Sequence, residues 1–318
     1  MKKITAFIFF IVAVLVMVIA PFLTNTKTQT KENGAILSVW QIDSFEGGSG
    51  SRTSFLRKVL LNYTKQNPTV SVLVSSHTPS SATSLIEKGV LPDVISYGPC
   101  SVELSLLAKK LPFAGSGGGE INGELYAVPF LRGGYFVIQR GGGSSEVIIS
   151  CGEYSMAPVA TLFSGVKAKS YITLQNQEAY SLFLKKTSAT MVGTQRDIIR
   201  LNGRGIDYTA TPISEFSDVY QYLSVTSINN AVHAEKLVGY LLSDKVQSKV
   251  TEINMLSVSI SGLYKGEENY SLLEKVKIKY TPSAFSTKSH LETCNQTALN
   301  LLNSGGDKGD IIKYLKQL

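Results

Sequence analysis

Residues 35–75, AILSVWQIDSFEGGSGSRTSFLRKVLLNYTKQNPTVSVLVS, carry the pattern that determines the fold class. Ala35–Gln41 is a short apolar run between polar neighbours, which predicts a strand. A loop rich in glycine and serine follows. Arg52–Gln66 then places apolar residues at the spacing of an amphipathic helix, and Pro68 ends it. Thr69–Ser75 is again strand-like, so the stretch predicts a β-α-β unit.

The same alternation continues along the chain. Ser80–Lys88 and Val102–Lys109 are expected to be helices, and Asp93–Tyr97 a strand. Strands that alternate with helices favour an α/β layer with a parallel sheet. A second body with strands and helices of its own begins near Phe130. The 318 residues leave room for about two domains of ordinary size.

The amino-terminal sequence is typical of an exported protein. Met1-Lys2-Lys3 precedes the unbroken apolar run Ile4–Leu23, and a polar linker follows it. This pattern fits a cleaved export signal, and it also fits a retained anchor of about 20 helical residues. Both interpretations place the rest of the chain outside the cell. The net charge of +7 is scattered along the sequence, which argues against nucleic-acid binding.

The cysteines and histidines do not form a recognisable metal site. Cys100, Cys151 and Cys294 are too few and too widely spaced for a disulfide scaffold or a zinc site, and the three histidines stand far apart. We expect no metal and no cofactor. One disulfide among the three cysteines and three unpaired thiols both remain open.

The loop from Glu46 to Arg52 is the first candidate functional segment. Its glycines permit a tight backbone, and its NH groups at the start of a helix can hold an anion or a polar ligand oxygen. It matches neither a Walker loop nor a dinucleotide fingerprint. The alternative is a turn that only caps the helix through Ser49 or Ser51. Its position at a strand end favours a ligand.

Carboxylates and aromatic side chains supply two further hypotheses. Asp43 with Glu46, or Glu153 beside Tyr154, could act as the acid/base pair of a glycosidase, although solvated loop carboxylates are the simpler interpretation. No motif with a catalytic nucleophile is present. Aromatic rings at predicted strand ends can pack on sugar rings, and about a third of them are expected to touch a ligand. They are Trp40, Tyr97, Tyr126, Tyr135, Tyr154 and Tyr208.

Six stretches, taken in order, resemble the extracellular solute-binding proteins of ABC importers, in the maltose-binding-protein-like family that binds sugars and oligosaccharides. The most specific are Asn122–Pro129 (NGELYAVP) and the end of the helix at 234–247 (LLSDKVQ). The others are the strand at 35–41 with its loop, NPTVSV at 67–72, PDVISY at 92–97 and ATMVGTQRD at 189–197. The resemblance covers nearly the whole chain after residue 34.

This resemblance implies a two-lobe α/β fold of type II, in which mixed sheets are flanked by helices and the ligand lies in the cleft between lobes. Residues 1–34 would be the signal or anchor with its linker. Residues 35–130 and 218–260 would form lobe one, and residues 131–217 and 261–318 would form lobe two.

The resemblance also implies a set of ligand-binding residues. Asp43, Glu46 and Arg52 would contact ligand from the loop after the first strand. Tyr97 would be an aromatic platform, and Arg132 and Tyr135 would line the cleft. Family members of the maltose type carry Trp shortly after the position of Gly193, where this chain has Gln195 and Arg196. With Trp40 and Tyr154 these complete the predicted site, and the arginines would suit an acidic sugar, a phosphorylated ligand or a small peptide.

The function implied is capture of a small solute, a carbohydrate or acidic sugar, and its delivery to the membrane subunits of an ABC permease. The protein would then be an extracellular monomer without enzymatic activity. A surface glycosidase that uses Glu46 or Glu153 remains an alternative. A sensory or adhesive protein on the same fold, tethered by its amino-terminal helix, is another, because fold does not determine function.

Overall fold

The computed structural model describes residues 34–44, 47–113 and 117–315. The apolar run Ile4–Leu23, predicted to be a signal or an anchor, lies outside these residues. Among the residues that are described, none belongs to a helix both long and apolar enough to span a bilayer.

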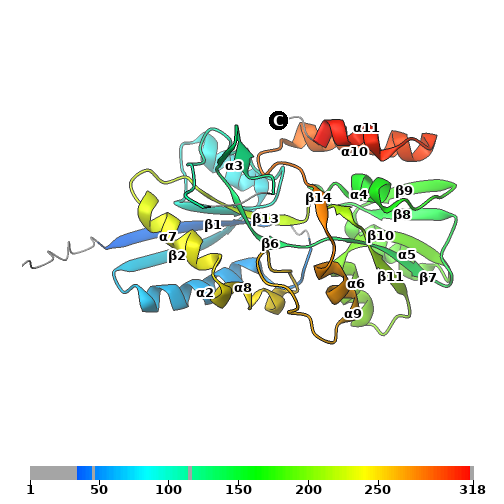
Figure 1. Ribbon diagram of the computed structural model, residues 1–318, viewed down its shortest axis with the longest axis horizontal. Helices are drawn as coiled ribbons and strands as arrows, with labels where there is room; N and C mark the ends of the chain where they lie inside the picture. The colour runs from blue at the N-terminus through cyan, green and yellow to red at the C-terminus, as the bar shows by residue number, and fades with distance from the viewer. Residues whose placement is uncertain (1–33, 45–46, 114–116, 316–318) are drawn as a thin grey trace, which may run out of the picture. The chain divides into compact units, whose positions relative to one another are not determined.

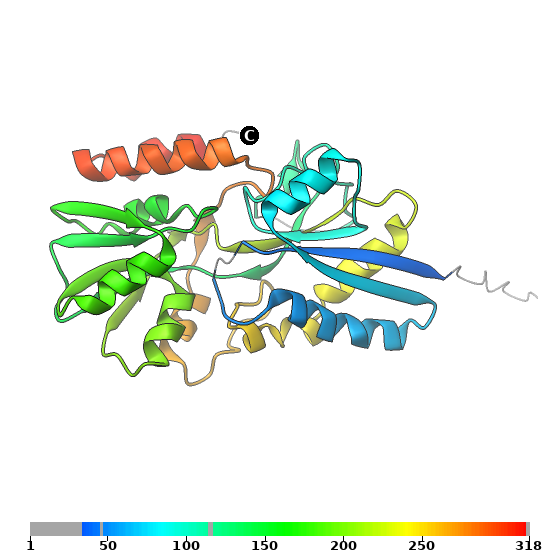
Figure 2. The same ribbon diagram turned by 180° about the vertical axis from the view of Figure 1, so that it is seen from behind.

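The first lobe is built on a five-stranded sheet in the order β2-β1-β3-β13-β6 (Figure 1). β1 is parallel to both β2 and β3, and Figure 2 shows β1 and β2 side by side in blue. β13 is antiparallel to β3 and to β6, so the sheet is mixed. The strands are β1 (Ala35–Ile42), β2 (Val70–His77), β3 (Val94–Tyr97), β6 (Val128–Arg132) and β13 (Tyr220–Val225).

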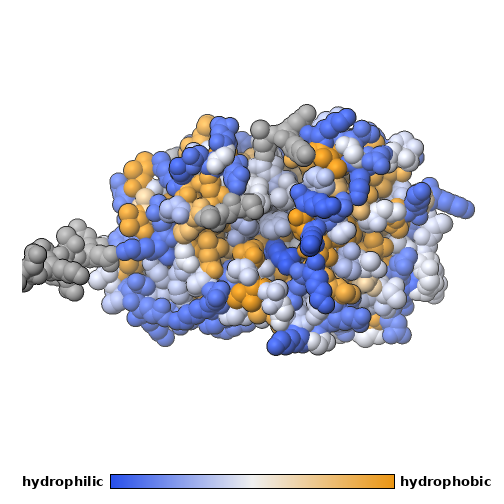
Figure 3. All heavy atoms as spheres, viewed as in Figure 1, coloured by the Kyte–Doolittle hydropathy of each residue, from blue (hydrophilic) through white to orange (hydrophobic). Residues whose placement is uncertain are grey.

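Helices cover both faces of this sheet (Figure 1). α2 (Arg52–Gln66), α7 (Ala231–Leu241), α8 (Asp244–Gln247) and the short 3-10 helix η1 (Val250–Ile253) lie on one side, and α3 (Pro79–Glu87) lies on the other. α2 is amphipathic as predicted, because Phe55, Val59 and Tyr63 are buried while Lys58 and Lys65 are exposed. Hydrophilic residues accordingly gather over α2 at the lower left of Figure 3.

The second lobe is built on a five-stranded sheet in the order β11-β7-β10-β8-β9. β7 is antiparallel to β10 and β11, whereas β8 is parallel to β10 and β9. The strands are β7 (Tyr135–Arg140), β8 (Glu146–Ser150), β9 (Ser170–Leu174), β10 (Ala189–Thr194) and β11 (Thr209–Pro212). This mixed sheet and its flanking helices agree with the predicted fold class.

Helices cover both faces of the second sheet as well. α4 (Ala157–Ser164), α10 (Lys288–Ser304) and α11 (Lys308–Leu315) share one hydrophobic core. α5 (Asn176–Lys185), α6 (Gln195–Asn202) and α9 (Glu268–Glu274) share the other. Two short strand pairs complete the description: β4 (Glu120–Ile121) with β5 (Glu124–Leu125), and β12 (Glu215–Phe216) with β14 (Ile278–Tyr280).

The helix predicted at Val102–Lys109 is wrong. The chain makes turns there instead, and Leu106 is 96% exposed. The N–H groups of Leu107 and Ala108 both bond to the carbonyl of Leu104, and the N–H of Lys109 then bonds to Val225 at the end of β13. No helix continues from this turn because the N–H of Lys109, the next backbone donor, bonds to the sheet.

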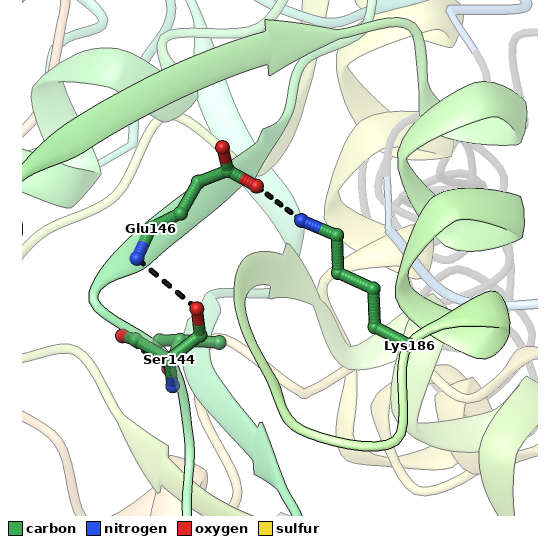
Figure 4. A network of polar contacts seen from close by, with 4 residues as sticks. Ser144, Glu146 and Lys186 are labelled. Atoms are coloured by element: carbon green, nitrogen blue, oxygen red, sulfur yellow. Dashed lines mark hydrogen bonds and ion pairs between the residues drawn. The ribbon is translucent and has the colours of Figure 1, made fainter.

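A network of polar contacts lies at the start of β8 in the second lobe (Figure 4). The N–H of Glu146 donates to the Ser144 hydroxyl at 3.1 Å, and the Glu146 carboxylate accepts from the Lys186 ammonium. The two charged side chains are 28% and 35% exposed, so solvent screens much of their attraction.

Replacing Lys186 by Met is therefore expected to lower the free energy of unfolding by no more than about 1 kcal/mol. Urea denaturation of Lys186→Met, Glu146→Gln and the double variant would measure the coupling between the two side chains. A coupling well above about 1 kcal/mol would contradict this expectation.

Candidate functional site

The two lobes meet where three chain segments lie side by side. β6 ends at Arg132 and β7 begins at Tyr135, so Gly133-Gly134 is the whole first connection between the sheets. The N–H of Gly133 donates at 2.6 Å to the carbonyl of Val219, which belongs to the returning connection. The backbone of Arg132 also exchanges two hydrogen bonds with that of Leu256. This junction brings strand-end loops of both lobes together.

The Gln195 side chain fills the centre of the junction. It is fully buried at the start of α6, and its Oε1 accepts a hydrogen bond from the N–H of Gly134 at 3.1 Å. Its Nε2 lies 3.4 Å from the sulfur of Met255. A β-carbon on Gly133 would come within 2.2 Å of that Nε2 and 2.7 Å of Val219. A side chain at position 133 would therefore displace Gln195 or Val219.

The glycine-rich loop after β1 reaches this junction. Gly47 has φ +66°, and a β-carbon there would lie 2.7 Å from Val219 and 3.1 Å from Gln195. A β-carbon on Gly48, at φ +59°, would lie 2.6 Å from both the Ile253 carbonyl and the Met255 sulfur. Positive φ and close approach together require glycine at both positions.

A first cavity of about 300 Å³ opens beside the junction. It is lined by the loop of the first lobe, the start of α2 and η1, and from the second lobe by Arg196 of α6. The Arg52 guanidinium donates to the Gly47 carbonyl at 3.2 Å, and the Asp43 carboxylate accepts from the Ser76 hydroxyl of β2. The lining residues are Asp43, Gly47, Gly48, Ser49, Gly50, Ser51, Arg52, Arg196 and Ile253.

A second cavity of about 310 Å³ also takes its walls from both lobes. α3 and the turn after β3 line it from the first lobe, and Tyr154 and Lys288 from the second. The Lys288 ammonium bonds the Glu153 carboxylate at 2.7 Å and lies 5.4 Å from the centre of the Tyr154 ring. The lining residues are Thr83, Ile86, Glu87, Cys100, Ser101, Val102, Glu103, Tyr154 and Lys288.

Electrostatics of the second cavity follow from that ion pair. The hydrogen bond from Lys288 holds the pKa of the Glu153 carboxyl below its ordinary value, and the same contact raises the pKa of Lys288. Burial, with the Glu153 charge as the next cause, raises the pKa of Tyr154. The Glu153 carboxylate and the Lys288 ammonium are therefore both charged at neutral pH.

The structure brings three of the predicted ligand-binding residues together: Asp43, Arg52 and Arg196 line the first cavity. Tyr154 lines the second. Glu46 lies outside the described residues.

Five other predicted residues lie elsewhere. Tyr97 and Tyr135 are fully buried, and their hydroxyls lie 3.1 Å and 2.8 Å from those of Ser224 and Ser155. Trp40 is 6% exposed and packs on His77 under α3, and Gln195 fills the junction. The guanidinium of Arg132 donates to backbone carbonyls of Ser257 and Glu274, at 3.0 Å each. In this conformation none of the five lines a cavity named above, so their contact with ligand stays a prediction.

Several lining residues were not predicted. The glycine-rich loop that was predicted to be functional contains Gly47, Gly48 and Ser49, so the glycine pattern indicated this segment but not the individual residues. Ile253 and Lys288 come from distant segments, and no local pattern marks them. Thr83 and Glu87 were interpreted only as parts of a helix.

Burial raises the pKa of two further titratable groups, Asp218 and Cys294. Asp218, between β12 and β13, accepts from the N–H of Met156 at 2.6 Å, and burial raises the pKa of its carboxyl. No disulfide joins any two of Cys100, Cys151 and Cys294, and burial raises the pKa of Cys294 to about 11. Across the described ranges, no cluster of three or more His, Cys, Asp or Glu side chains could hold a metal.

No protein-family model matches the chain, and no curated protein matches it. Solved structures do match. The sugar-binding protein of Xanthomonas citri has a TM-score of 0.60 at 12% identity, over 88% of this chain and 95% of that one. The galacto-N-biose/lacto-N-biose I-binding protein of a Bifidobacterium longum ABC transporter has a TM-score of 0.58 at 10% identity, over 90% and 96%. The GacH receptor of Streptomyces glaucescens, solved with acarbose, has a TM-score of 0.56 at 13% identity, over 89% and 97%. The chain therefore has the two-lobe α/β fold of these sugar-binding proteins.

Proposed function

We propose that the protein is the extracellular solute-binding component of an ABC importer and captures a carbohydrate between its lobes. The observation that carries this proposal is that this fold has cavities walled by both lobes, among them the two described above. At about 300 Å³ each, they fall at the lower end of the range for small-molecule sites, about 300–1,000 Å³. A solute of one or two sugar rings suits this size.

The mechanism follows from the junction. Residues 35–130 with 218–260, and 131–217 with 261–318, would move as two bodies about the connections at Gly133-Gly134, near Val219 and near Leu256. Hinge closure around a ligand is a common mode of switching, and a ligand shifts the equilibrium only by its preference for one state. The closed form would then dock on the permease. Residues 1–34 would serve as the export signal or the anchor.

Thermal unfolding against a panel of neutral sugars, uronic acids, sugar phosphates and small peptides tests the proposal. A ligand at 100 times its Kd stabilises the folded state by about 2.7 kcal/mol, which raises the melting temperature by about 5 °C. We expect such a rise with at least one carbohydrate, growing with its concentration. Unchanged melting across the whole panel, with folded protein, would refute the proposed function.

The charge state of Glu153 argues against the alternative of a glycosidase. A general acid needs a raised pKa, whereas the Lys288 contact lowers the pKa of Glu153. Asp43 lines the other cavity and accepts from Ser76. If the proposal is right, no turnover of chromogenic glycosides is expected. A tethered sensory role differs only in the fate of residues 1–34, which sequencing the amino terminus of the mature protein would reveal.

A further inference from the structure

We infer that the second lobe has a carbohydrate site of its own, in a third cavity of about 580 Å³ at the carboxyl ends of β8 and β9. The ligand is a sugar unit without negative charge. All the described lining residues fall within 151–178 and 288–299, which belong to the second lobe. The inference goes beyond the proposed function, in which the solute lies between the lobes.

The third cavity lies where two neighbouring strands send their connections to opposite faces of the sheet. β8 and β9 are adjacent and parallel. The chain leaves β8 toward α4, on the face that α10 also covers, and it leaves β9 toward α5, on the other face (Figure 1). In open α/β sheets, ligands bind in the crevice outside the carboxyl ends of the strands at such a switch point. The topology of the second lobe therefore favours a ligand at this cavity.

The size and the floor of the third cavity suit a sugar ring. Its volume falls within the range of small-molecule sites, about 300–1,000 Å³. Leu174 at the end of β9 contributes apolar surface, as do Leu291 and Leu299 of α10. Removing the apolar face of a ring from water against these side chains is favourable. The floor therefore gives affinity that does not depend on charge.

Polar groups around this floor can accept and donate hydrogen bonds. The carboxylates of Glu178 and Glu292 line the cavity and are exposed, and neither forms a hydrogen bond or an ion pair with a residue that the structure describes. Gln175 is the N-cap of α5, but its side chain makes no capping bond, so its amide is not used by the helix. Sugar hydroxyls both donate and accept, so they match this set of groups.

The charges at the third cavity disfavour an anion. Lys288 is the one cation among the described lining residues, and its ammonium bonds the Glu153 carboxylate at 2.7 Å. That hydrogen bond is the main cause of the raised pKa of Lys288, to which the Glu292 charge adds less. Glu178 lies in the first turn of α5, where it offsets the partial positive charge of the helix start. A uronate or a sugar phosphate is therefore disfavoured, whereas a neutral or an amino sugar is not.

Occupation of the third cavity does not require the lobes to close. Its described walls come from one lobe, whereas the first and second cavities take their walls from both. Lys288 also lines the second cavity, so the second and third cavities meet at this residue. The sugar unit is then either a separate molecule or the far end of a chain whose first rings lie between the lobes. Both sources present the same chemistry to the walls.

NMR of the mature protein, with isotope-labelled leucine methyl groups, tests this inference. The ligands are glucose, galactose and mannose, their amino sugars and uronates, and the neutral disaccharides and longer chains. We expect the methyl signals of Leu174, Leu291 and Leu299 to shift with at least one neutral or amino sugar. The matching uronate should need at least about a tenfold higher concentration, because two carboxylates repel it.

Small-angle scattering, recorded in parallel, measures closure and distinguishes the two sources of the sugar unit. Leucine shifts that appear with a monosaccharide, at concentrations different from those that close the lobes, would identify a separate molecule. Shifts that appear only with longer chains, at the concentrations that close the lobes, would identify the far end of the solute. Either result supports the inference.

Variants locate the ligand in the third cavity. Glu178→Gln and Glu292→Gln are each expected to weaken the binding that the leucine signals report about fivefold, because a neutral acceptor forms a weaker hydrogen bond than a carboxylate. Glu268→Gln is the matched control, since Glu268 is exposed in the first turn of α9 and does not line the cavity. It should leave that binding unchanged. Circular dichroism and melting temperature confirm folding, and each glutamine variant tests the site if the other fails to fold.

The outcomes separate this inference from the proposed function. Closure of the lobes by a carbohydrate, with the three leucine signals unchanged across the whole panel, would overturn the inference while the proposed function stands. A uronate that binds as tightly as its neutral counterpart, or equal weakening in Glu268→Gln, would also overturn it. Leucine shifts without closure by any carbohydrate would support the inference and count against the proposed function.

Discussion

Replacing Gly133 by Ala is expected to destabilise the folded protein by about 2–3 kcal/mol, as overpacking of a filled site usually does. The new methyl group would lie 2.2 Å from the Gln195 amide nitrogen and 2.7 Å from Val219. Gln195 is fully buried and its Oε1 accepts from the N–H of Gly134, so moving this side chain disturbs a buried hydrogen bond. If Gln195 is displaced, that N–H loses its acceptor, which adds to the cost.

A second substitution tests whether this contact is the cause. Gln195→Ser removes the amide group that the methyl group meets but leaves Val219 in place, so the double variant is expected to regain part of the stability lost in Gly133→Ala, relative to Gln195→Ser alone. Urea denaturation of the four proteins gives the coupling energy. Gly239→Ala, whose methyl group would make only an ordinary contact with Phe113 at 3.6 Å, is the control without a close approach, and Gly133→Ala should cost more. Additive effects at 133 and 195 would refute the contact.

This pair also shows how far sequence patterns could identify the site. Gln195 was predicted to contact ligand because it lies shortly after Gly193. Family members of the maltose type carry Trp shortly after the matching glycine. In the structure it is a packing residue of the junction, whereas its neighbour Arg196 lines the first cavity. Adjacent residues at the start of a helix point in different directions, and no spacing rule assigns the directions before the helix itself is known.

Secondary structure was predictable where one face of an element is exposed. α2 alternates buried and exposed positions at the helical period, and β1 was found from its apolar run. α4 was not predicted, because seven of its eight residues are buried and its sequence APVATLFS shows no polar face. α6 was missed for another reason. Its first turn QRD was interpreted as ligand chemistry, whereas Thr194 and Asp197 form a capping box there.

The aromatic residues show the same limit for the site. Tyr97 ends β3 and Trp40 lies near the carboxyl end of β1, where ligands of α/β proteins bind, whereas Tyr135 begins β7. Strand ends in this fold are also covered by α3, by the turn after β3 and by the opposite lobe, so all three rings are buried. Which strand end stays open depends on loops that are distant in the sequence. The charged loop residues Asp43 and Arg52 were easier to place, because they lie on the glycine-rich loop itself.

Asp197 gives the second large effect, which is a dependence of stability on pH. Its carboxylate is 3% exposed and accepts from the N–H of Thr194 at 3.1 Å. Burial raises the pKa of this carboxyl to about 6 from its ordinary 3.8, against the smaller opposing effects of the Thr194 hydrogen bond and of Arg200. The folded state therefore binds a proton at Asp197 more tightly than the unfolded state does.

The sign of the effect follows directly. Because the folded pKa lies above the unfolded one, the stabilising contribution of this group is present in full below about pH 4 and is lost as the pH rises through about 6. A difference of about two pKa units corresponds to about 3 kcal/mol.

In Asp197→Asn the side chain stays neutral and can still accept from Thr194, so we expect the wild type to lose about 3 kcal/mol relative to this variant between pH 4 and pH 7. Urea denaturation of both proteins across that range isolates the group, because every other carboxylate is common to the two. Asp207→Asn, the same substitution at an exposed position, is the control for the change from Asp to Asn. Parallel stability curves for wild type and Asp197→Asn would mean that the buried carboxyl keeps its ordinary pKa and that the capping box does not place it in an apolar environment.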